Sequence, residues 1–178
     1  MSVFATTLGL VAIGAGASGL AAQEEDADAK IASAMSAAPA VISADATIMD
    51  HDGTVLREGD NGWTCFPETA ALGAMCNEAH WNEMIGALMA QEDFTASEFS
   101  VSYMLAGDGA APGVSNIDPY ATEPTEDNDW VREGPHLMII VPDPAMLEGM
   151  STDPADPVYV MWKDTPYAHI MVRVEAYE

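Results

Sequence analysis

The chain has 178 residues, with 29 Asp and Glu against 5 Lys and Arg and a formal net charge of −24. So few cationic side chains exclude a surface that wraps a nucleic-acid backbone, and they equally exclude electrostatic docking on an anionic membrane surface. Because 49% of the residues are hydrophobic, the chain can build a core, and we expect a folded domain of ordinary size rather than a disordered chain.

Residues 1–22 have the layout of a secretory signal peptide. They carry no charged side chain, an apolar run from Leu8 to Ile13 gives way to small residues, and acidic residues follow from Glu24. An uncleaved membrane anchor is the alternative, but Gly and Ala make this segment a poor membrane span. We therefore predict cleavage near Ala22 and export to the periplasm or the extracellular space.

Behind this leader we expect an acidic N-terminus with a short helix at 23–45, followed by a single domain at 46–178. Every charged residue lies after the leader, so the full net charge falls on residues 23–178. Repulsion on that scale destabilises a compact state at low salt, and salt screens it over about 8–10 Å. The composition therefore predicts a halophilic protein, adapted to a saline medium that surrounds it.

Cys65 and Cys76 are the two cysteines of the chain. In an exported protein they can close one small disulfide loop, worth about 3 kcal/mol in the chain-entropy model. A metal site is the alternative, but no C-x2-C or H-x3-H partner lies nearby. We predict a structural disulfide.

The first half of the chain shows clear local signals. Asp28 is the expected N-cap of the first helix, and Asp50-His51-Asp52-Gly53 is typical of a hairpin turn. Asn77 is the expected N-cap of a second helix with an apolar stripe that includes Trp81 and Met84. The predicted elements are a helix at 28–35, strands at 46–49, 54–57 and 62–66, a helix at 78–90 and a strand at 99–105.

The second half begins with residues 106–135, which show little periodicity and predict a long loop of functional character. The uninterrupted apolar run at 136–141 predicts a central strand. Asp143 and Pro144 are suited to start a short helix that ends at Gly149. Two further strands are predicted at 158–162 and 167–174. Together these elements predict an α+β fold with a mainly antiparallel sheet of about six strands, two helices and one disulfide.

The segment from Ala46 to Val55 resembles the first motif of the haloacid dehalogenase-like phosphatases, in which an apolar strand precedes D-x-D-G-T. The resemblance implies that Asp50 is the nucleophile, that Asp52 is the general acid, and that Mg²⁺ neutralises the phosphate. It covers ten residues only. The family also needs a helix after nearly every strand and a downstream lysine, for which Lys163 is the only candidate. A hairpin with an Asp-Gly turn produces the same letters for local reasons.

Two His-x-Met triplets, His136-Leu137-Met138 and His169-Ile170-Met171, each fall on a predicted strand. Residues i and i+2 of a strand point to the same face, so each imidazole lies beside a thioether. If the two strands are neighbours, His136, Met138, His169 and Met171 converge on a site that suits Cu(I). The alternative is that methionine fills apolar gaps, since the chain contains 12 of them.

The last predicted strand has two distinct faces. One face is uniformly apolar and comprises Ala168, Ile170, Val172 and Val174. We expect this face to pack on the core, which places His169 and Met171 on the opposite face, where core packing does not explain a methionine.

Four further motifs, NGWTC at 61–65, GPHLM at 134–138, YVMWK at 159–163 and TPYAHIM at 165–171, resemble those of a family of small exported bacterial proteins with no established function. The resemblance spans roughly residues 30–174 and implies export and a single domain, but no activity.

These observations favour an exported acidic binding protein, with copper, another metal ion or a small molecule as its ligand. Two alternatives stay open. One is the phosphatase, and the other is a structural or self-associating envelope protein without a small ligand.

Overall fold

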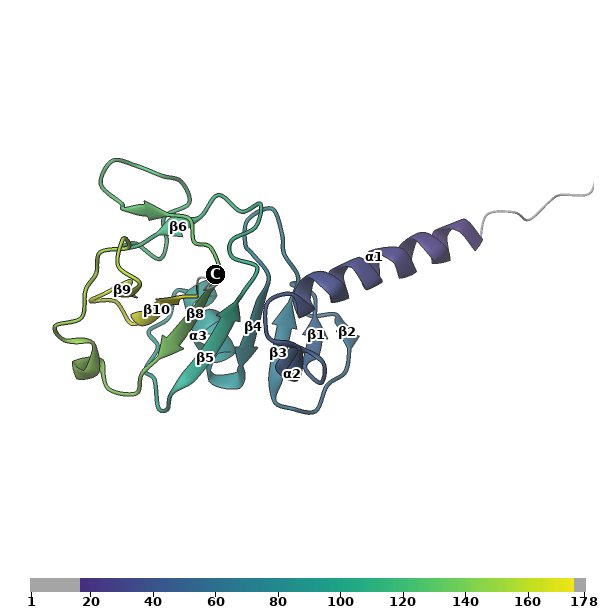
Figure 1. Cartoon of the computed structure of the whole chain (residues 1–178), viewed down its shortest axis with the longest axis horizontal. Helices are drawn as coiled ribbons and strands as arrows, with labels where there is room; N and C mark the ends of the chain where they lie inside the picture. Colours follow the sequence, from purple (N-terminus) through teal and green to yellow (C-terminus); the bar gives the residue numbers. More distant parts are fainter. Residues whose placement is uncertain (1–16, 175–178) are drawn as a thin grey trace, which may run out of the picture.

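The computed structural model describes residues 17–174, with side chains from residue 26 onward. This part of the chain forms three α-helices, one 3-10 helix, an eight-stranded sheet and a two-stranded ribbon (Figure 1). The helices are α1 (Ala17–Met35), α2 (Ala40–Ser43), α3 (Ala79–Ala90) and the 3-10 helix η1 (Pro144–Leu147). The predicted α+β class is confirmed, whereas the predicted numbers of strands and helices were too low.

The large sheet has the strand order β2-β1-β3-β4-β5-β8-β10-β9. Its strands are β1 (Thr47–Met49), β2 (Val55–Arg57), β3 (Trp63–Phe66), β4 (Met75–Glu78), β5 (Ser100–Met104), β8 (His136–Ile140), β9 (Val158–Met161) and β10 (His169–Arg173). All neighbours are antiparallel except β1 and β3, which are parallel. The mainly antiparallel sheet is therefore confirmed, and β8 is a central strand as predicted.

The first two strands form the predicted hairpin. The N–H of Asp50 donates to the carbonyl of Thr54 at 2.8 Å, and the N–H of Gly53 donates to the carbonyl of Asp50 at 3.0 Å. Gly53 adopts a φ of 88°, a conformation that glycine reaches without steric cost.

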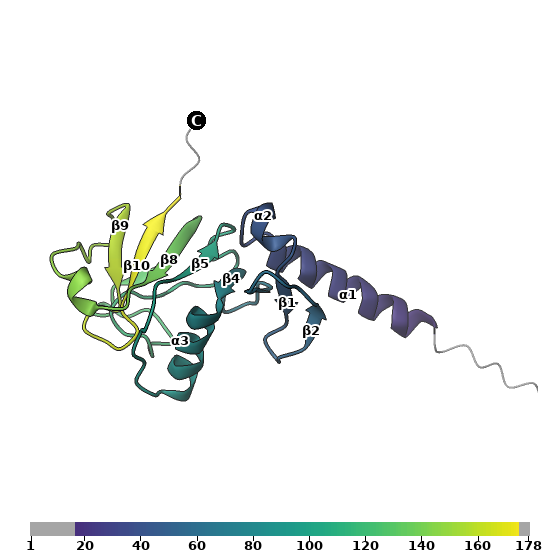
Figure 2. The ribbon, with the colours of Figure 1, turned by 90° about the horizontal axis from the view of Figure 1, so that it is seen from below.

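Helix α1 is longer than predicted and extends away from the strands at its N-terminal end (Figures 1 and 2). Asp28 lies inside the helix, so its predicted role as the N-cap is wrong. The reason is that alanine, a strong helix former, is frequent on both sides of Asp28. The C-terminal end of α1 packs on the sheet, where Ala34 joins Ile48 and the two cysteines in a small core. The predicted leader, residues 1–22, lies largely outside the described residues.

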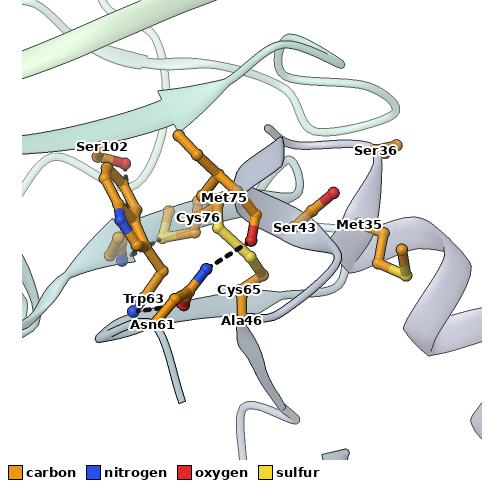
Figure 3. Close-up of a disulfide and its surroundings, with 12 residues drawn as sticks. Met35, Ser36, Ser43, Ala46, Asn61, Trp63, Cys65, Met75, Cys76 and Ser102 are labelled. Atoms are coloured by element: carbon orange, nitrogen blue, oxygen red, sulfur yellow. Dashed lines mark hydrogen bonds between the residues drawn. A yellow bond between two sulfur atoms is a disulfide. The ribbon is translucent and has the colours of Figure 1, made fainter. Parts of the chain in front are cut away.

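The disulfide between Cys65 and Cys76 is confirmed, and it joins directly opposed residues of β3 and β4 (Figure 3). The sequence pattern did not predict β4, because it is short and partly polar. Asn77 belongs to this strand and is buried, so its predicted role as the cap of α3 is wrong. Its side chain instead donates to Asn82 at 2.9 Å and accepts from the hydroxyl of Ser102 at 2.5 Å.

Helix α3 covers one face of the sheet, and the main core lies between them (Figure 2). On β5 the buried face comprises Ser100, Ser102 and Met104. On β10 the buried residues are His169 and Met171, whereas Ile170 and Val172 are partly exposed. The expectation that the aliphatic face of 167–174 packs on the main core is therefore wrong. The opposite face of the sheet carries only a smaller cluster around Val141, Leu147 and Val160. The aliphatic residues of β10 on that face are therefore only partly buried.

The predicted loop at 106–135 contains a small ribbon of β6 (Val114–Ser115) and β7 (Trp130–Val131). It is tied to the end of β9 by Trp162, whose indole N–H donates to the carbonyl of Ser115 at 2.7 Å. The predicted helix at 144–149 is the short η1, and the side chain of Asp143 caps it as expected by accepting from the N–H of Ala145. Within residues 17–174 no helix has the length and apolarity that a membrane crossing requires.

Candidate metal centre

A cavity of about 240 Å³ lies between α3, the strands β5, β8, β9 and β10, and the 106–135 loop. Its walls are predominantly apolar, and methionine dominates them. Seven of the 12 methionines of the chain line it, namely Met75, Met84, Met89, Met104, Met138, Met161 and Met171. Four polar residues complete the lining, namely Asp108, Glu133, His136 and His169.

The four residues predicted for the copper site all line this cavity. Strands β8 and β10 are antiparallel neighbours, and their register places Met138 directly opposite Met171. His136 and His169 flank this methionine pair on opposite sides, because the strands run in opposite directions. At about 3.4 Å per residue, the two histidines are separated by roughly 14 Å along the sheet. The strand register thus brings the thioethers together and separates the imidazoles.

His169 is the most deeply buried polar group of the cavity, with an exposed fraction of 1%. Its Nδ1 lies 2.9 Å from the carbonyl oxygen of Tyr167. A carbonyl can only accept, so Nδ1 carries the proton and Nε2 carries a free electron pair. Among the described residues, Nε2 has no hydrogen-bond partner.

The surroundings of this ring keep it neutral. Burial lowers the pKa of His169 to about 4, against the opposing effect of the hydrogen bond with Tyr167. Trp81 and Trp162 both meet the imidazole edge-on, with ring centroids 5.2 and 5.1 Å from it. His169 is therefore a neutral imidazole enclosed by aromatic rings, with an unused electron pair.

Each imidazole also has a methionine on the neighbouring outer strand, at a position that was not among the predicted site residues. Met161 on β9 is directly opposite His169, and Met104 on β5 is directly opposite His136. Both are buried and line the cavity. Only the strand order could have identified them, since neither belongs to a His-x-Met triplet.

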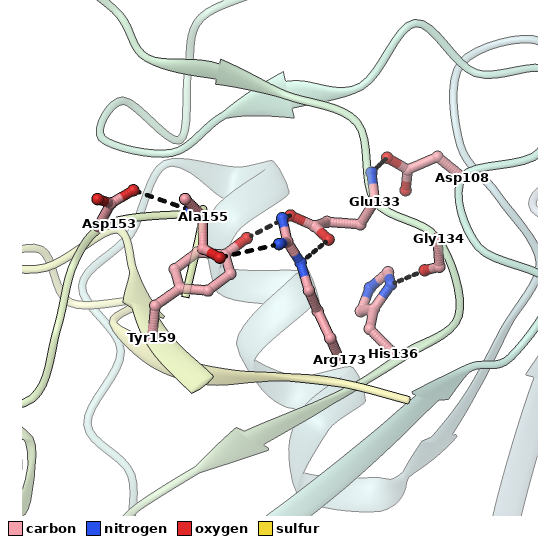
Figure 4. A network of polar contacts seen from close by, with 8 residues as sticks. All are labelled: Asp108, Glu133, Gly134, His136, Asp153, Ala155, Tyr159 and Arg173. Carbon is pink, nitrogen blue, oxygen red and sulfur yellow. Dashed lines mark hydrogen bonds and ion pairs between the residues drawn. The ribbon is translucent and has the colours of Figure 1, made fainter. Parts of the chain in front are cut away.

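The end of the cavity near His136 is polar (Figure 4). The carboxylate of Glu133 accepts from Arg173 at 2.8 and 2.9 Å and from the hydroxyl of Tyr159 at 2.9 Å. Burial raises the pKa of Glu133, but these bonds outweigh it and hold the pKa below its ordinary value. Nearby, burial raises the pKa of Asp108, even though this carboxylate accepts from the N–H of Glu133.

The two aspartates of the phosphatase-like motif lie in the β1–β2 turn, at the opposite end of the strand order from the strands that line the cavity. One oxygen of Asp50 accepts from Lys30 at 2.9 Å and the other from the N–H of His51 at 2.8 Å. Asp52 accepts from the N–H of Thr54 at 2.9 Å. The bond from Lys30 lowers the pKa of Asp50, and the bond from Thr54 lowers that of Asp52. The turn backbone and the Lys30 ammonium of α1 therefore account for the hydrogen bonds of both carboxylates.

Among residues 26–174, no three His, Cys, Asp or Glu side chains are grouped so that they could hold a metal ion. A metal in the cavity would therefore depend on thioethers.

No protein-family model matches the chain, and neither a curated protein nor a solved structure matches it significantly. The site must therefore be interpreted from its own residues.

Proposed function

We propose that the protein is an exported binding protein that holds Cu(I) in the methionine-lined cavity, with His169 as its imidazole ligand. The observation that carries this proposal is that Nε2 of His169, buried among methionines, has no hydrogen-bond partner within the described part of the chain. A buried acceptor without a partner costs about 1–3 kcal/mol. A bound ion would satisfy it.

The neighbouring thioethers define which ion this is. Met171 lies two residues after His169 on the same strand face, and Met161 lies directly opposite His169. One neutral imidazole and two thioethers form a soft donor set that suits Cu(I) and the similar Ag(I). Zn²⁺ and Cu²⁺ favour additional nitrogen, thiolate or oxygen donors, which this part of the cavity lacks among the described residues.

Export is part of the proposal, and the disulfide supports it, because disulfides persist in oxidising compartments. The uncharged leader at 1–22 supports it independently. Expression of the full chain in a bacterium, followed by mass spectrometry of the periplasmic fraction, should recover a species that begins near Gln23. Recovery of only the full-length chain from the cytoplasm would contradict export.

Metal binding is tested by anaerobic Cu(I) titration against a competing chelator. The unmodified protein should retain Cu(I). In the His169→Gln variant the affinity of this site for Cu(I) should fall by more than about 100-fold, which exceeds the roughly 10- to 100-fold loss that follows from removing a partner outside the first coordination shell. His51→Gln is the matched control, because His51 is exposed in the β1–β2 turn. Unchanged affinity in His169→Gln, or no retention by the unmodified protein, would contradict the proposal.

A second candidate is a small apolar molecule that carries one hydroxyl group. The volume of about 240 Å³ favours it, since an engineered apolar cavity of about 150 Å³ already binds benzene. The indole N–H of Trp81, which is buried and has no hydrogen-bond partner among residues 26–174, would serve as a donor to the hydroxyl oxygen. A rise in melting temperature with phenol, and none with Cu(I), would favour this candidate over copper.

A further inference from the structure

We infer that the cavity holds two Cu(I) ions, the second bound by His136 and related to the first by a local two-fold axis. This inference rests on the proposed function and extends it to a second site. Its basis is the repetition of one arrangement of imidazole, carbonyl and thioethers on the four strands β5, β8, β10 and β9.

The two imidazoles are held in the same way. Nδ1 of His136 lies 2.7 Å from the carbonyl of Gly134, and Nδ1 of His169 lies 2.9 Å from that of Tyr167. In both cases the carbonyl belongs to the residue two positions earlier in the chain. Since a carbonyl only accepts, each Nδ1 is the donor, which leaves Nε2 as the ring atom available to an ion. The backbone thus fixes the two rings through equivalent hydrogen bonds.

The thioethers repeat in the same way around the two rings. Each histidine is followed two residues later by a methionine on the same face, Met138 or Met171. Each also faces a methionine across the adjacent outer strand, Met104 for His136 and Met161 for His169. Each imidazole therefore has two neighbouring thioethers of its own, and all four methionines line the cavity.

The axis that relates the two sets passes between Met138 and Met171, which are directly opposed. His136 and His169 lie on either side of this pair, roughly 14 Å apart along the sheet. Because strand side chains stand roughly perpendicular to the sheet, this backbone spacing places each imidazole beside its own methionines rather than beside the other imidazole. The separation therefore favours two ions, each with one imidazole, over a single shared ion.

The second site differs from the first in its electrostatics. Arg173 lies directly opposite His136 and pairs with the buried carboxylate of Glu133 (Figure 4). A guanidinium near the second ion opposes binding of a further cation, whereas the carboxylates of Glu133 and Asp108 at this end of the cavity favour it. The imidazole of His169, by contrast, is kept neutral by burial and contacts Trp81 and Trp162 edge-on, and among the described residues no guanidinium lies opposite it. We expect the His169 site to fill first and the His136 site to be the weaker one.

The test is an anaerobic titration of the full chain with Cu(I) against a chelator, which measures stoichiometry and stepwise affinity. The unmodified protein should bind two ions. His136→Gln should keep only the tighter one, His169→Gln only the weaker one, and the double variant neither. Saturation at one ion that His136→Gln leaves unchanged would overturn the second site and leave the proposed function intact. If the protein binds one ion, and His136→Gln and His169→Gln each abolish its binding, the two histidines share a single site and the inference is overturned. No binding of Cu(I) by the unmodified protein would overturn both proposals.

A pair of volume-conserving substitutions guards against loss of folding. Met104→Leu and Met161→Leu each remove one thioether with little change in side-chain volume, and cores tolerate such exchanges well. Met104→Leu should weaken only the second binding step, and Met161→Leu only the first, by about tenfold or more in each case. Equal effects of the two variants on both steps would contradict two separate sites.

Discussion

At the scale of single residues, His169 concentrates the chemistry of the cavity. Burial deprives its imidazole of water, the carbonyl of Tyr167 engages one nitrogen, and the other nitrogen has no partner among the described residues. In the metal-free protein this group is a cost to folding, because a buried acceptor without a partner has lost its hydration. A ligand that uses this nitrogen binds only the folded state and stabilises it by mass action.

The same burial makes the stability of the metal-free protein depend on pH. The pKa of His169 is about 4 in the folded protein, whereas the ordinary value for histidine, which the unfolded chain retains, is about 6.5. Between these values the unfolded chain binds a proton that the folded protein does not, so the free energy of unfolding falls as pH falls from about 6.5 to about 4. The expected slope is about 1.4 kcal/mol per pH unit within this window.

Urea denaturation of the metal-free protein at several pH values measures this dependence. His169→Gln should lose this part of the slope, whereas His51→Gln should retain it. Carboxylates also titrate in this pH range. The comparison therefore uses the difference in slope of the free energy of unfolding against pH between each variant and the unmodified protein. Equal slopes in the unmodified protein and in His169→Gln would show that the imidazole is not buried in its neutral form.

At the scale of elements, strand pairing determines which residues meet. The pairing of β8 with β10 joins the two His-x-Met triplets, and the outer strands β5 and β9 each add a methionine. Helix α3 closes the cavity from the covered face with Trp81 and Met84. The disulfide acts elsewhere in the same sheet, where it ties β3 to β4 beside the end of α1 (Figure 3).

Removing the disulfide with the double variant Cys65→Ser, Cys76→Ser should lower the free energy of unfolding by about 3 kcal/mol. Closing a small loop restricts the unfolded chain, and this restriction is what the variant loses. Chemical denaturation with and without a reductant provides the measurement. The reductant should destabilise the unmodified protein and leave the double variant unchanged. A double variant as stable as the unmodified protein would contradict this account of the bond.

The sequence predicted those elements whose signals are local. The Asp-Gly turn predicts the hairpin, and the apolar run at 136–141 predicts a central strand. Strand β4 was missed because Met75–Glu78 shows neither alternation nor an apolar run. The covered face of β10 was predicted wrongly, since its aliphatic residues lie on the face with the smaller cluster.

For the candidate site, the two-residue period of a strand correctly grouped each histidine with its own methionine. The hypothesis that all four residues converge on one site depends on β8 and β10 being neighbours. They are neighbours and all four residues line one cavity, but the register places the two histidines on opposite sides of the methionine pair. Met104 and Met161 could not be predicted, because their positions depend on the order and register of β5 and β9. Local patterns thus indicated the donor types, and long-range pairing determined their grouping.

At the scale of the whole molecule, the net charge of −24 is scarcely compensated. Three of the cationic side chains connect distant parts of the chain. Lys30 binds Asp50, Arg173 binds Glu133, and Arg57 donates to the backbone carbonyls of Ser43 and Ala46. The remaining carboxylates repel one another across the surface.

Salt should therefore stabilise the fold. We expect the melting temperature to rise as NaCl increases over the first few hundred millimolar, because the Debye length shortens from about 30 Å at 0.01 M to about 8 Å at 0.15 M. Calorimetry or circular dichroism at constant pH measures this rise. The same series in Na₂SO₄ at matched ionic strength separates screening from salt-specific effects. A melting temperature independent of NaCl would contradict the account.

The binding of Cu(I) by thioethers and an imidazole is tested most directly by X-ray absorption at the copper K-edge, on the full chain loaded anaerobically with one equivalent of Cu(I). The spectrum should show a monovalent copper with sulfur and nitrogen neighbours, and the nitrogen contribution should fall in His169→Gln. Because both cysteines are joined in the disulfide, the sulfur must come from methionine. A copper surrounded only by oxygen and nitrogen would contradict the proposed centre.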